Sequence, residues 1–326
     1  ADTMTRPTTA RDRERPPEGR IADPVQLVGH AGLAIRRDGG SPTRSTLDDA
    51  LTAGIDRLEL DVCHAADGCL VLRHDAALPD GRLVGDLDES SLRRADPDLL
   101  TLDDAVEHLD GRVPMLLDLK TARGAELLGI WFRRRLDLDD FALCTENLSW
   151  LLHLRFAAPR VARWPSFPDI GDRRTHHVQR VVVGLWRSHA SLSGLRRGAL
   201  DVHRAAMQLR HAPRESLGRL GGLPWRERLP YDIRRARDDI AAEGICVHHW
   251  VVSEQLVQEA HDLDLHVNTW TVNNPFAARV MADAGVDSVT TDRVDLVRLA
   301  LQARSQPGRH APTRPRITEA VRTVPR

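Results

Sequence analysis

Apolar and polar positions alternate between about residues 25 and 300 in a pattern that predicts strands followed by helices. Short apolar runs rich in β-branched residues are followed by segments with apolar residues at helical spacing. Such helices are predicted at Thr46–Ala53, Leu102–Leu109, Glu254–Leu263 and Pro275–Ala284, and two of them end at a glycine. The predicted strands are Val25–Gly29, Arg57–Asp61, Val113–Asp118, Phe141–Cys144, Arg160–Arg163, Ile245–His248, His266–Trp270 and Asp287–Thr290.

Eight strand–helix units over about 280 residues predict an α/β fold of the (β/α)8 barrel type, the TIM barrel, in a single domain. A doubly wound sheet is the alternative, but the first predicted strand lacks the Gly-x-Gly-x-x-Gly turn typical of that fold. The stretch Pro165–Ala242 fits the repeat least well. It is expected to be an elaborated connection after the fifth strand.

The chain is divided into three parts. Residues 1–22 are polar and contain Pro16-Pro17, which predicts a disordered N-terminal arm without the apolar segment of a signal peptide. Residues 23–303 form the predicted barrel domain. Residues 304–326 carry six arginines and four prolines, which predicts a disordered basic tail.

Charge and cysteine usage narrow the functional classes. The 326 residues include 46 basic and 47 acidic side chains, a balance that disfavours a nonspecific nucleic-acid binder. No apolar run is long enough to predict a transmembrane segment. The four cysteines are too scattered for a disulfide scaffold or zinc site, so free thiols and a cytoplasmic location are expected, with secretion as the alternative. The oligomeric state stays open.

Acidic side chains lie at the ends of two predicted strands. Glu59 and Asp61 are two residues apart on one strand and therefore face the same side, and Asp118 ends another strand. A barrel gathers the carboxyl ends of its strands around one mouth. Because three converging carboxylates repel one another, the pattern predicts a divalent cation, Mg²⁺ or Ca²⁺, held by these oxygens.

Two histidines and one lysine complete the predicted site. His30 follows the first strand, and pairing outward from an Asp67-Gly68 hairpin turn puts His74 directly opposite Asp61. Imidazoles near a metal suit acid and base catalysis. Lys120 is the single lysine among the 46 basic residues and would supply a point charge for an anion. These residues together predict metal-assisted cleavage of a phosphoryl ester.

Several short motifs in the same order resemble the glycerophosphodiester phosphodiesterase family, whose fold is a TIM barrel. They span residues 25–300 and comprise Val28-Gly29-His30-Ala31-Gly32, Ser45-Thr46-Leu47, Glu59-Leu60-Asp61-Val62, Asp67-Gly68, His74-Asp75, Asp118-Leu119-Lys120, Trp270-Thr271-Val272-Asn273, Gly285-Val286-Asp287 and Thr291-Asp292.

The resemblance implies a role for each matching residue. His30 and His74 match the acid/base pair, and Lys120 matches a phosphate-contacting lysine. Trp270 matches a tryptophan that packs on the glycerol moiety, and Asn273 of the same motif is a further candidate on the substrate side. The three metal ligands correspond to Glu59, Asp61 and Asp118. The implied reaction hydrolyses glycerophosphodiesters to glycerol 3-phosphate and an alcohol, with Ca²⁺ or Mg²⁺ as cofactor. A lysophospholipid-type substrate is the alternative.

The chain departs from the family pattern in three of its motifs. Ala31 replaces an arginine, Thr43-Arg44-Ser45-Thr46 replaces Pro-Glu-Asn-Thr, and Asp118 replaces a glutamate. Aspartate also ligates hard cations, so the last change is mild. Our hypothesis is that Arg44 returns to the phosphate-binding mouth the positive charge lost at position 31.

Two alternatives remain open at this point. The Asp-x-Lys form also occurs in barrels that resemble phospholipase D toxins and release cyclic phosphates. That branch lacks the Trp-Thr-Val-Asn motif of this chain, so the hydrolase is preferred. The altered phosphate-side residues also allow a barrel that binds its ligand without turning it over.

Overall fold

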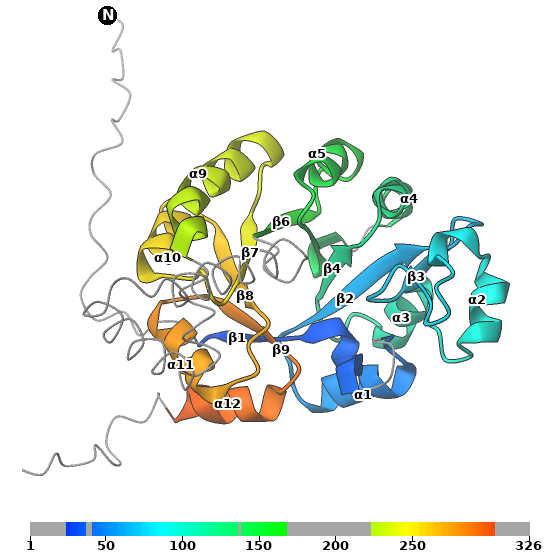
Figure 1. The fold of residues 1–326 in the computed structure, drawn as a ribbon, viewed down its shortest axis with the longest axis horizontal. Coiled ribbons are helices and arrows are strands. Elements are labelled where there is room, and N and C mark those ends of the chain that lie inside the picture. The colour runs from blue at the N-terminus through cyan, green and yellow to red at the C-terminus, as the bar shows by residue number, and fades with distance from the viewer. Residues whose placement is uncertain (1–23, 37–40, 136–137, 168–222, 304–326) are drawn as a thin grey trace, which may run out of the picture.

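The fold is a closed parallel barrel surrounded by helices (Figure 1). The computed structural model describes residues 24–36, 41–135, 138–167 and 223–303. Each of the eight parallel strands pairs with two neighbours, and β1 closes the barrel by pairing with both β2 and β9. The barrel strands are β1 (Gln26–Gly29), β2 (Arg57–His64), β4 (Met115–Leu119), β5 (Phe141–Thr145), β6 (Ala162–Phe167), β7 (Gly244–His248), β8 (His266–Trp270) and β9 (Ser288–Thr291).

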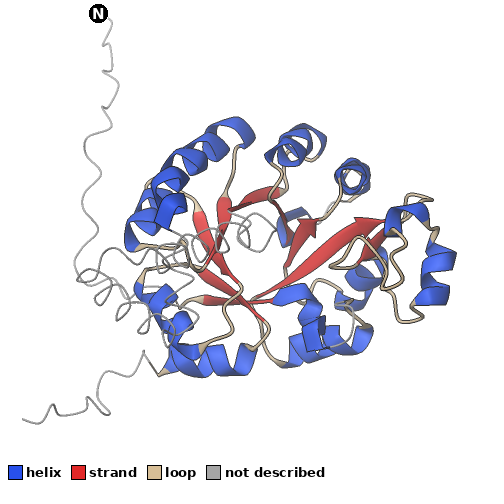
Figure 2. Cartoon of the chain, viewed as in Figure 1, coloured by secondary structure: helices blue, strands red, loops and turns tan. Residues whose placement is uncertain are grey.

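Helices connect successive strands on the outside of the barrel (Figure 2). A short antiparallel strand, β3 (Leu70–Leu72), pairs with the end of β2. Three short 3-10 segments complete the described elements, at His30–Arg36, Val84–Asp86 and Leu138–Asp140. The helices are α1 (Arg44–Thr52), α2 (Glu89–Ala95), α3 (Leu102–Leu109), α4 (Ala122–Phe132), α5 (Leu148–Ala157), α9 (Leu223–Ile240), α10 (Glu254–His261), α11 (Pro275–Asp283) and α12 (Val294–Gln302).

Alternation along β2 explains how one strand serves both the core and the site. Leu58, Leu60 and Val62 are fully buried and belong to the main hydrophobic cluster between the strands and the helices. Glu59 and Asp61 lie between them and therefore point to the opposite side, into the barrel. The strand thus buries one face against the helices while it carries two carboxylates on the other.

Local hydrogen bonds fix where the helices begin. The Thr101 hydroxyl accepts a bond from the backbone N–H of Asp104, and the Asp104 carboxylate accepts one from the backbone N–H of Thr101. This capping box satisfies backbone donors that the first turn of α3 would otherwise leave unpaired. Five of the described helices that follow barrel strands begin with an N-cap side chain that accepts a backbone N–H, namely Thr43, Thr121, Asn147, Ser253 and Asn274. Helix α12, after β9, has no side-chain cap.

The predicted barrel is confirmed, with two differences in or next to the stretch Pro165–Ala242, which fits the strand–helix repeat least well. The sixth element of the sheet, β6, runs to Phe167 instead of ending at Arg163. The stretch predicted as a connection contains the long helix α9. Its pattern was hard to recognise because Pro230 lies inside the helix and charged residues are frequent in it. The arm predicted for residues 1–22, the tail 304–326 and residues 168–222 lie outside the described part of the chain.

The predicted register of the β2–β3 hairpin is wrong by one residue. Val62 pairs with Leu72, and the N–H of Arg73, not that of His74, bonds to the carbonyl of Asp61. The turn has three residues, because Ala65 pairs with Cys69 and Gly68 has a positive φ of 88°. A three-residue loop that ends in a left-handed glycine shifts the pairing relative to the two-residue turn.

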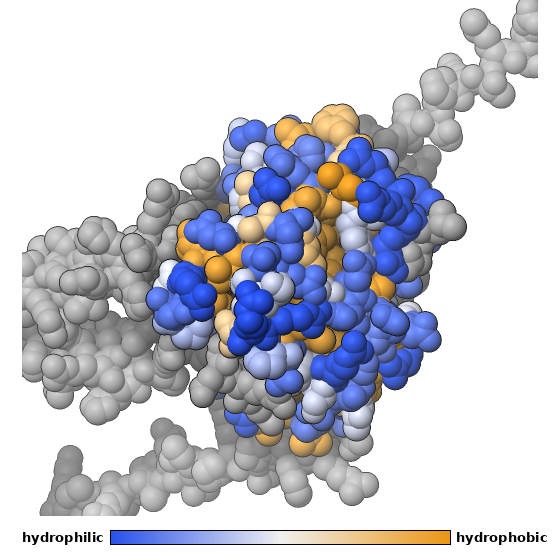
Figure 3. Space-filling model, turned by 90° about the vertical axis from the view of Figure 1, so that its right-hand side faces the viewer, coloured by the Kyte–Doolittle hydropathy of each residue, from blue (hydrophilic) through white to orange (hydrophobic). Residues whose placement is uncertain are grey.

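The outer surface shows no unusual accumulation of one residue type on the face seen in Figure 3. Hydrophilic side chains dominate this face, and hydrophobic ones are scattered between them. Scattered apolar side chains of this kind are ordinary on water-exposed surfaces. In the described residues, none of the helices combines the length and the apolar character that a membrane crossing requires. The four cysteines are free thiols, as expected.

One buried histidine makes the stability of the barrel dependent on pH. His266 stacks on Trp164 at 4.5 Å between ring centres, and its Nε2 lies 2.8 Å from the Ser288 hydroxyl. Burial lowers the pKa of His266 from its ordinary 6.5 to about 4. Between these two pH values the unfolded chain binds more protons than the folded one, so stability falls as the pH falls.

We therefore expect His266 to cost the folded state about 2 kcal/mol of unfolding free energy between pH 7 and pH 5. Urea unfolding at both pH values measures the change. The variant His266→Gln should lose that part of the pH dependence while keeping the contribution of all other groups. An equal drop in the native protein and the variant would contradict the assignment.

Candidate active site

The carboxyl ends of the strands open onto one cavity of about 610 Å³. Active sites of such barrels lie at this end. Six of the nine residues predicted from the sequence line the cavity, and a seventh, Asp61, clusters with two of them, Glu59 and Asp118. The six are His30, Glu59, His74, Asp118, Lys120 and Trp270. Residues from four separate strand ends thus converge as the barrel topology predicts.

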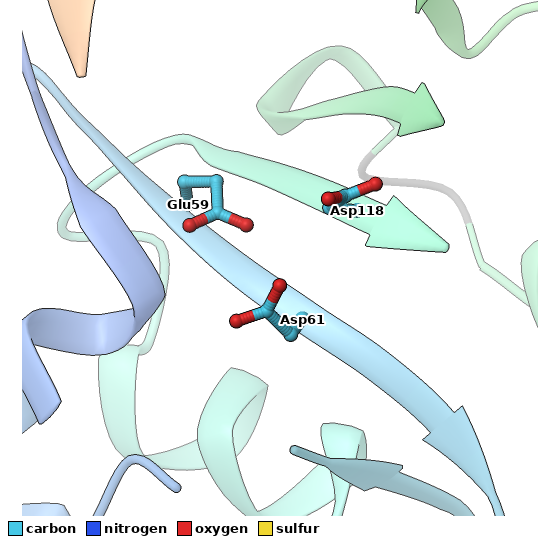
Figure 4. Close-up of side chains that lie close together, drawn as sticks. All are labelled: Glu59, Asp61 and Asp118. Atoms are coloured by element: carbon cyan, nitrogen blue, oxygen red, sulfur yellow. The ribbon is translucent and has the colours of Figure 1, made fainter. Parts of the chain in front are cut away.

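Three carboxylates form a compact cluster (Figure 4). Glu59 and Asp61 project from β2 and Asp118 from the neighbouring β4, and their side chains point toward a common space. Each offers one oxygen, and these oxygens all lie within 4.8 Å of one another. Asp61 and Asp118 are register partners on the two strands, which explains why residues so distant in sequence meet.

The cluster is electrostatically strained without a cation. Burial, reinforced by the charge of Asp61, raises the pKa of Glu59 to about 8. Burial also raises the pKa of Asp118, against the opposing effect of Lys120. One oxygen of Asp61, Oδ2, is buried and has no hydrogen-bond partner. An oxygen in that state costs free energy unless it binds something.

These features fit a hard divalent cation. Carboxylate oxygens are the ligands that Mg²⁺ and Ca²⁺ prefer, and a doubly charged ion would offset the repulsion between the three groups. The partnerless Asp61 oxygen would gain a ligand bond. The donor set contains no nitrogen or sulfur ligand at the same spacing among the described residues, so a hard ion suits it better than a soft one.

Lys120 holds two of these carboxylates. Its ammonium lies 2.8 Å from Asp61 Oδ1 and 2.6 Å from Asp118 Oδ2. Burial opposes the charged form, but the surrounding carboxylates outweigh it and raise the pKa of Lys120. The lysine therefore stays positively charged at the cavity wall, where it can attract an anionic group.

His30 is fixed by a carboxylate that the sequence did not single out. Its Nδ1 lies 2.8 Å from Oδ1 of Asp292, which follows β9 directly, and its Nε2 lies 4.0 Å from Glu59. Burial by itself lowers the pKa of His30, but the hydrogen bond to Asp292 and the charge of Glu59 outweigh it and raise the pKa to about 9. His30 is thereby oriented with Nε2 toward the cavity.

Asn273 supports this arrangement from behind. Its side-chain N–H donates to Asp292 Oδ2 at 2.5 Å, and its side-chain oxygen accepts bonds from the Asp292 backbone N–H and the Thr291 hydroxyl. Asn273 is not among the residues that line the cavity. Asn273 therefore acts on the cavity indirectly: it binds Asp292, and Asp292 binds His30.

His74 reaches the cavity from the opposite side despite the shifted hairpin. Its Nδ1 lies 3.0 Å from Asp75 Oδ1, and about half of its side chain is exposed. Both histidines therefore use Nδ1 to bind a carboxylate and leave Nε2 for another group. Trp270 also lines the cavity and packs, partly buried, against the cluster that contains Cys144 and Cys246.

Arg44 lies apart from the cavity. It begins α1, is 54% exposed, and its guanidinium is 3.6 Å from Asp104 on α3. Ala31, at the position of the missing family arginine, is buried, and its N–H donates to Glu59 Oε2 at 2.6 Å. The structure therefore offers no support for the hypothesis that Arg44 restores the lost charge.

Comparison with known proteins identifies the chain. The model of the glycerophosphoryl diester phosphodiesterase family matches residues 41–296, and the chain belongs to this family. By family it is a glycerophosphodiester phosphodiesterase, an enzyme that cleaves phosphoric diesters. No curated protein sequence matches it.

Solved structures share the fold at low sequence identity. A Silicibacter pomeroyi protein assigned to this enzyme class is 21% identical, with a TM-score of 0.62 over 88% of this chain and 96% of its own. The enzyme of Thermotoga maritima is 17% identical, with a TM-score of 0.56 over 84% and 98%. An Oleispira antarctica phosphodiesterase, solved with its product sn-glycerol-3-phosphate, is 16% identical, with a TM-score of 0.57 over 86% and 97%.

The exposed position of Arg44 gives a simple prediction. We expect Arg44→Ala to change kcat and KM for glycerophosphocholine by less than about twofold, because exposed ion pairs contribute little. Steady-state kinetics of the variant and the native enzyme measure this. A rise in KM of tenfold or more would restore the hypothesis that Arg44 attracts the phosphate.

Sequence reasoning gave no role to Asp292, although Thr291-Asp292 was among the family-like motifs. The signal was its place directly after the last barrel strand, where a polar side chain reaches the rim. Ser166 also lines the cavity, on the part of β6 that lies beyond the end of the predicted strand.

Proposed function

We propose that the protein is a metal-dependent phosphodiesterase that hydrolyses glycerophosphodiesters to sn-glycerol 3-phosphate and an alcohol. The observation that carries the proposal is the meeting of three carboxylates, two imidazoles and one ammonium in a single cavity. The bound product of the Oleispira antarctica relative belongs to the same chemistry.

Glu59, Asp61 and Asp118 would hold the divalent ion, Mg²⁺ or Ca²⁺. When bound, such an ion supplies positive charge that polarises a phosphoryl oxygen and stabilises the charge that develops there. Lys120 contributes a second positive charge at the same wall. The phosphate group is thus oriented by this side of the cavity.

The two histidines move the protons. In the first step the glycerol hydroxyl next to the ester attacks phosphorus and gives its proton to Nε2 of His74. Nε2 of His30 gives a proton to the oxygen of the leaving alcohol, and a cyclic phosphate forms. In the second step water attacks phosphorus, His30 takes its proton, and His74 returns one to the ring oxygen that leaves. No net proton is left on either residue.

Asp292 is a positioning residue in this scheme, because it binds His30 and not the substrate. We expect Asp292→Asn to lower kcat about 10- to 100-fold with little change in KM, since the isosteric amide no longer favours the same imidazole tautomer. Steady-state kinetics on glycerophosphocholine measure whether kcat falls while KM stays nearly constant. A change confined to KM would argue against positioning of His30.

A second candidate is a lyase that releases the cyclic phosphate as its product. The Asp118-x-Lys120 spacing, which also occurs in such barrels, favours it. The two reactions share the first step. Phosphorus NMR of the reaction mixture separates them, because a stable cyclic phosphate without glycerol 3-phosphate would replace the hydrolase by the lyase.

The decisive experiment incubates the protein with glycerophosphocholine and Mg²⁺ or Ca²⁺, with and without EDTA. We expect glycerol 3-phosphate to appear and EDTA to stop its release. Turnover that is insensitive to EDTA would refute the metal dependence. An absence of turnover on any phosphodiester, despite metal, would favour a barrel that only binds its ligand.

A further inference from the structure

The strand register arranges the inward side chains of the barrel in layers. In an eight-stranded barrel, alternate strands contribute four side chains to one layer. The next member of a layer lies two strands along the sheet and two residues beyond the register partner. Asp118 on β4 pairs with Cys144 on β5, which pairs with Trp164 on β6, and Ser166 lies two residues beyond Trp164. Continuing through β8 and β1, one layer contains four residues, and all four line the cavity: His30, Asp118, Ser166 and Trp270.

Ser166 is the member of this layer without a role in the chemistry described above. It is 8% exposed and lines the cavity. In the described part of the chain no hydrogen bond to its hydroxyl occurs. Its neighbour in the layer, Trp270, likewise has a buried Nε1–H without a partner. Buried polar groups are rarely left unpaired. The Trp270 N–H and the Ser166 hydroxyl on the cavity wall therefore provide two hydrogen-bonding groups that a polar ligand in the cavity can use.

The surroundings of Ser166 define what that ligand can be. Asp118, the member of the layer on β4, belongs to the carboxylate cluster, so the phosphate end of a substrate lies on that side. Beneath Ser166 lie the thiols of Cys144 and Cys246, which bury apolar surface and bond weakly. A neutral group that both donates and accepts a hydrogen bond fits this place, which is the description of an alcohol hydroxyl.

We propose that Ser166 is a substrate-binding residue that hydrogen-bonds the terminal hydroxyl of the glycerol moiety and so makes the enzyme prefer glycerol esters. The inference rests on the proposed function. The hydroxyl next to the ester is consumed as the nucleophile, which leaves the terminal hydroxyl as the group to be recognised. The free Nε1–H of Trp270 provides a second donor on the adjacent strand of the layer.

The proposal predicts selectivity for one hydroxyl group. A site that binds a substrate hydroxyl discriminates against an analogue without it, because the buried polar groups of the site are then left unpaired. Propane-1,2-diol phosphocholine keeps the attacking hydroxyl and lacks the terminal one. We expect the native enzyme to cleave it with a kcat/KM about 10- to 100-fold below that of glycerophosphocholine.

The test compares both substrates with native enzyme, Ser166→Ala and the control Ser288→Ala. Ser288 is also a buried barrel serine, but its hydroxyl bonds to Asn268 and it does not line the cavity. For Ser166→Ala we expect a loss of about 10- to 100-fold on glycerophosphocholine and less than about twofold on the propanediol ester. Ser288→Ala should leave the ratio between the two substrates as in the native enzyme.

The outcomes distinguish a failure of the proposed role of Ser166 from a failure of the proposed hydrolase activity. Equal losses on both substrates, no loss on either, or a native enzyme that does not distinguish the two esters would overturn the role of Ser166. Each of these results leaves the hydrolase intact. If the native enzyme releases no glycerol phosphate from glycerophosphocholine, the proposed function fails and the role of Ser166 fails with it.

Discussion

The variant Asp61→Asn is expected to lower kcat at least about 1,000-fold at any Mg²⁺ or Ca²⁺ concentration tested. Asp61 is 2% exposed, and its Oδ2 is the one cluster oxygen that is buried without a partner. An amide carries no charge and offers one oxygen instead of two, so it weakens both the attraction for the cation and its coordination. Metal-dependent kinetics on glycerophosphocholine measure the loss.

The metal-free fold provides the control for this variant. The substitution relieves repulsion between the carboxylates but also removes the 2.8 Å ion pair between Asp61 and Lys120. Thermal unfolding in EDTA therefore has to show that Asp61→Asn is still folded at the assay temperature. Asp80→Asn serves as a matched substitution, because Asp80 lies on the surface, paired with Arg82. It should keep full activity. Activity of Asp61→Asn within about tenfold of the native value would show that the cluster does not bind the catalytic cation.

Replacing either His30 or His74 by glutamine is expected to lower kcat about 100- to 10,000-fold, which is the range that acid and base catalysis contributes. Each imidazole has its Nδ1 held by a carboxylate, and the proposed proton transfers use its Nε2. Glutamine can occupy a similar volume but cannot exchange a proton near neutral pH. Single-turnover kinetics under saturating substrate isolate the chemical step.

The double variant distinguishes cooperation from independent effects. If the two residues act as a pair in each proton transfer, His30→Gln/His74→Gln should be about as slow as the slower single variant. The control His108→Gln removes a histidine that pairs with Asp48 outside the cavity and should retain activity. Losses that multiply in the double variant would argue against paired acid and base roles.

The barrel was predictable because its signals are local. The alternation of Leu58, Leu60 and Val62 with Glu59 and Asp61 fixes which face of β2 is buried, and the same logic applies to β4. The rule that strand ends converge then brings distant carboxylates together. Both steps need only residue spacing and strand order, and both agree with the structure.

The details that failed depend on backbone geometry that spacing does not encode. The sequence Ala66-Asp67-Gly68 permits a two-residue and a three-residue turn. A two-residue type I′ turn needs both Asp67 and Gly68 to be left-handed, whereas in the structure only Gly68 is. Asn273 and Asp292 are both polar and both near the rim, so only their mutual hydrogen bonds show which one touches His30. Ser166 is assigned to its layer by the pairing register of β6 with its neighbouring strands, which residue spacing along one strand does not give.

A crystal structure of the protein soaked with Mn²⁺, whose anomalous scattering locates it, tests the central claim most directly. We expect one strong peak bound at once by oxygens of Glu59, Asp61 and Asp118, with Lys120 displaced from at least one of them. A peak that contacts one of these carboxylates alone, or that lies elsewhere in the barrel, would contradict the shared metal site on which the proposed function rests.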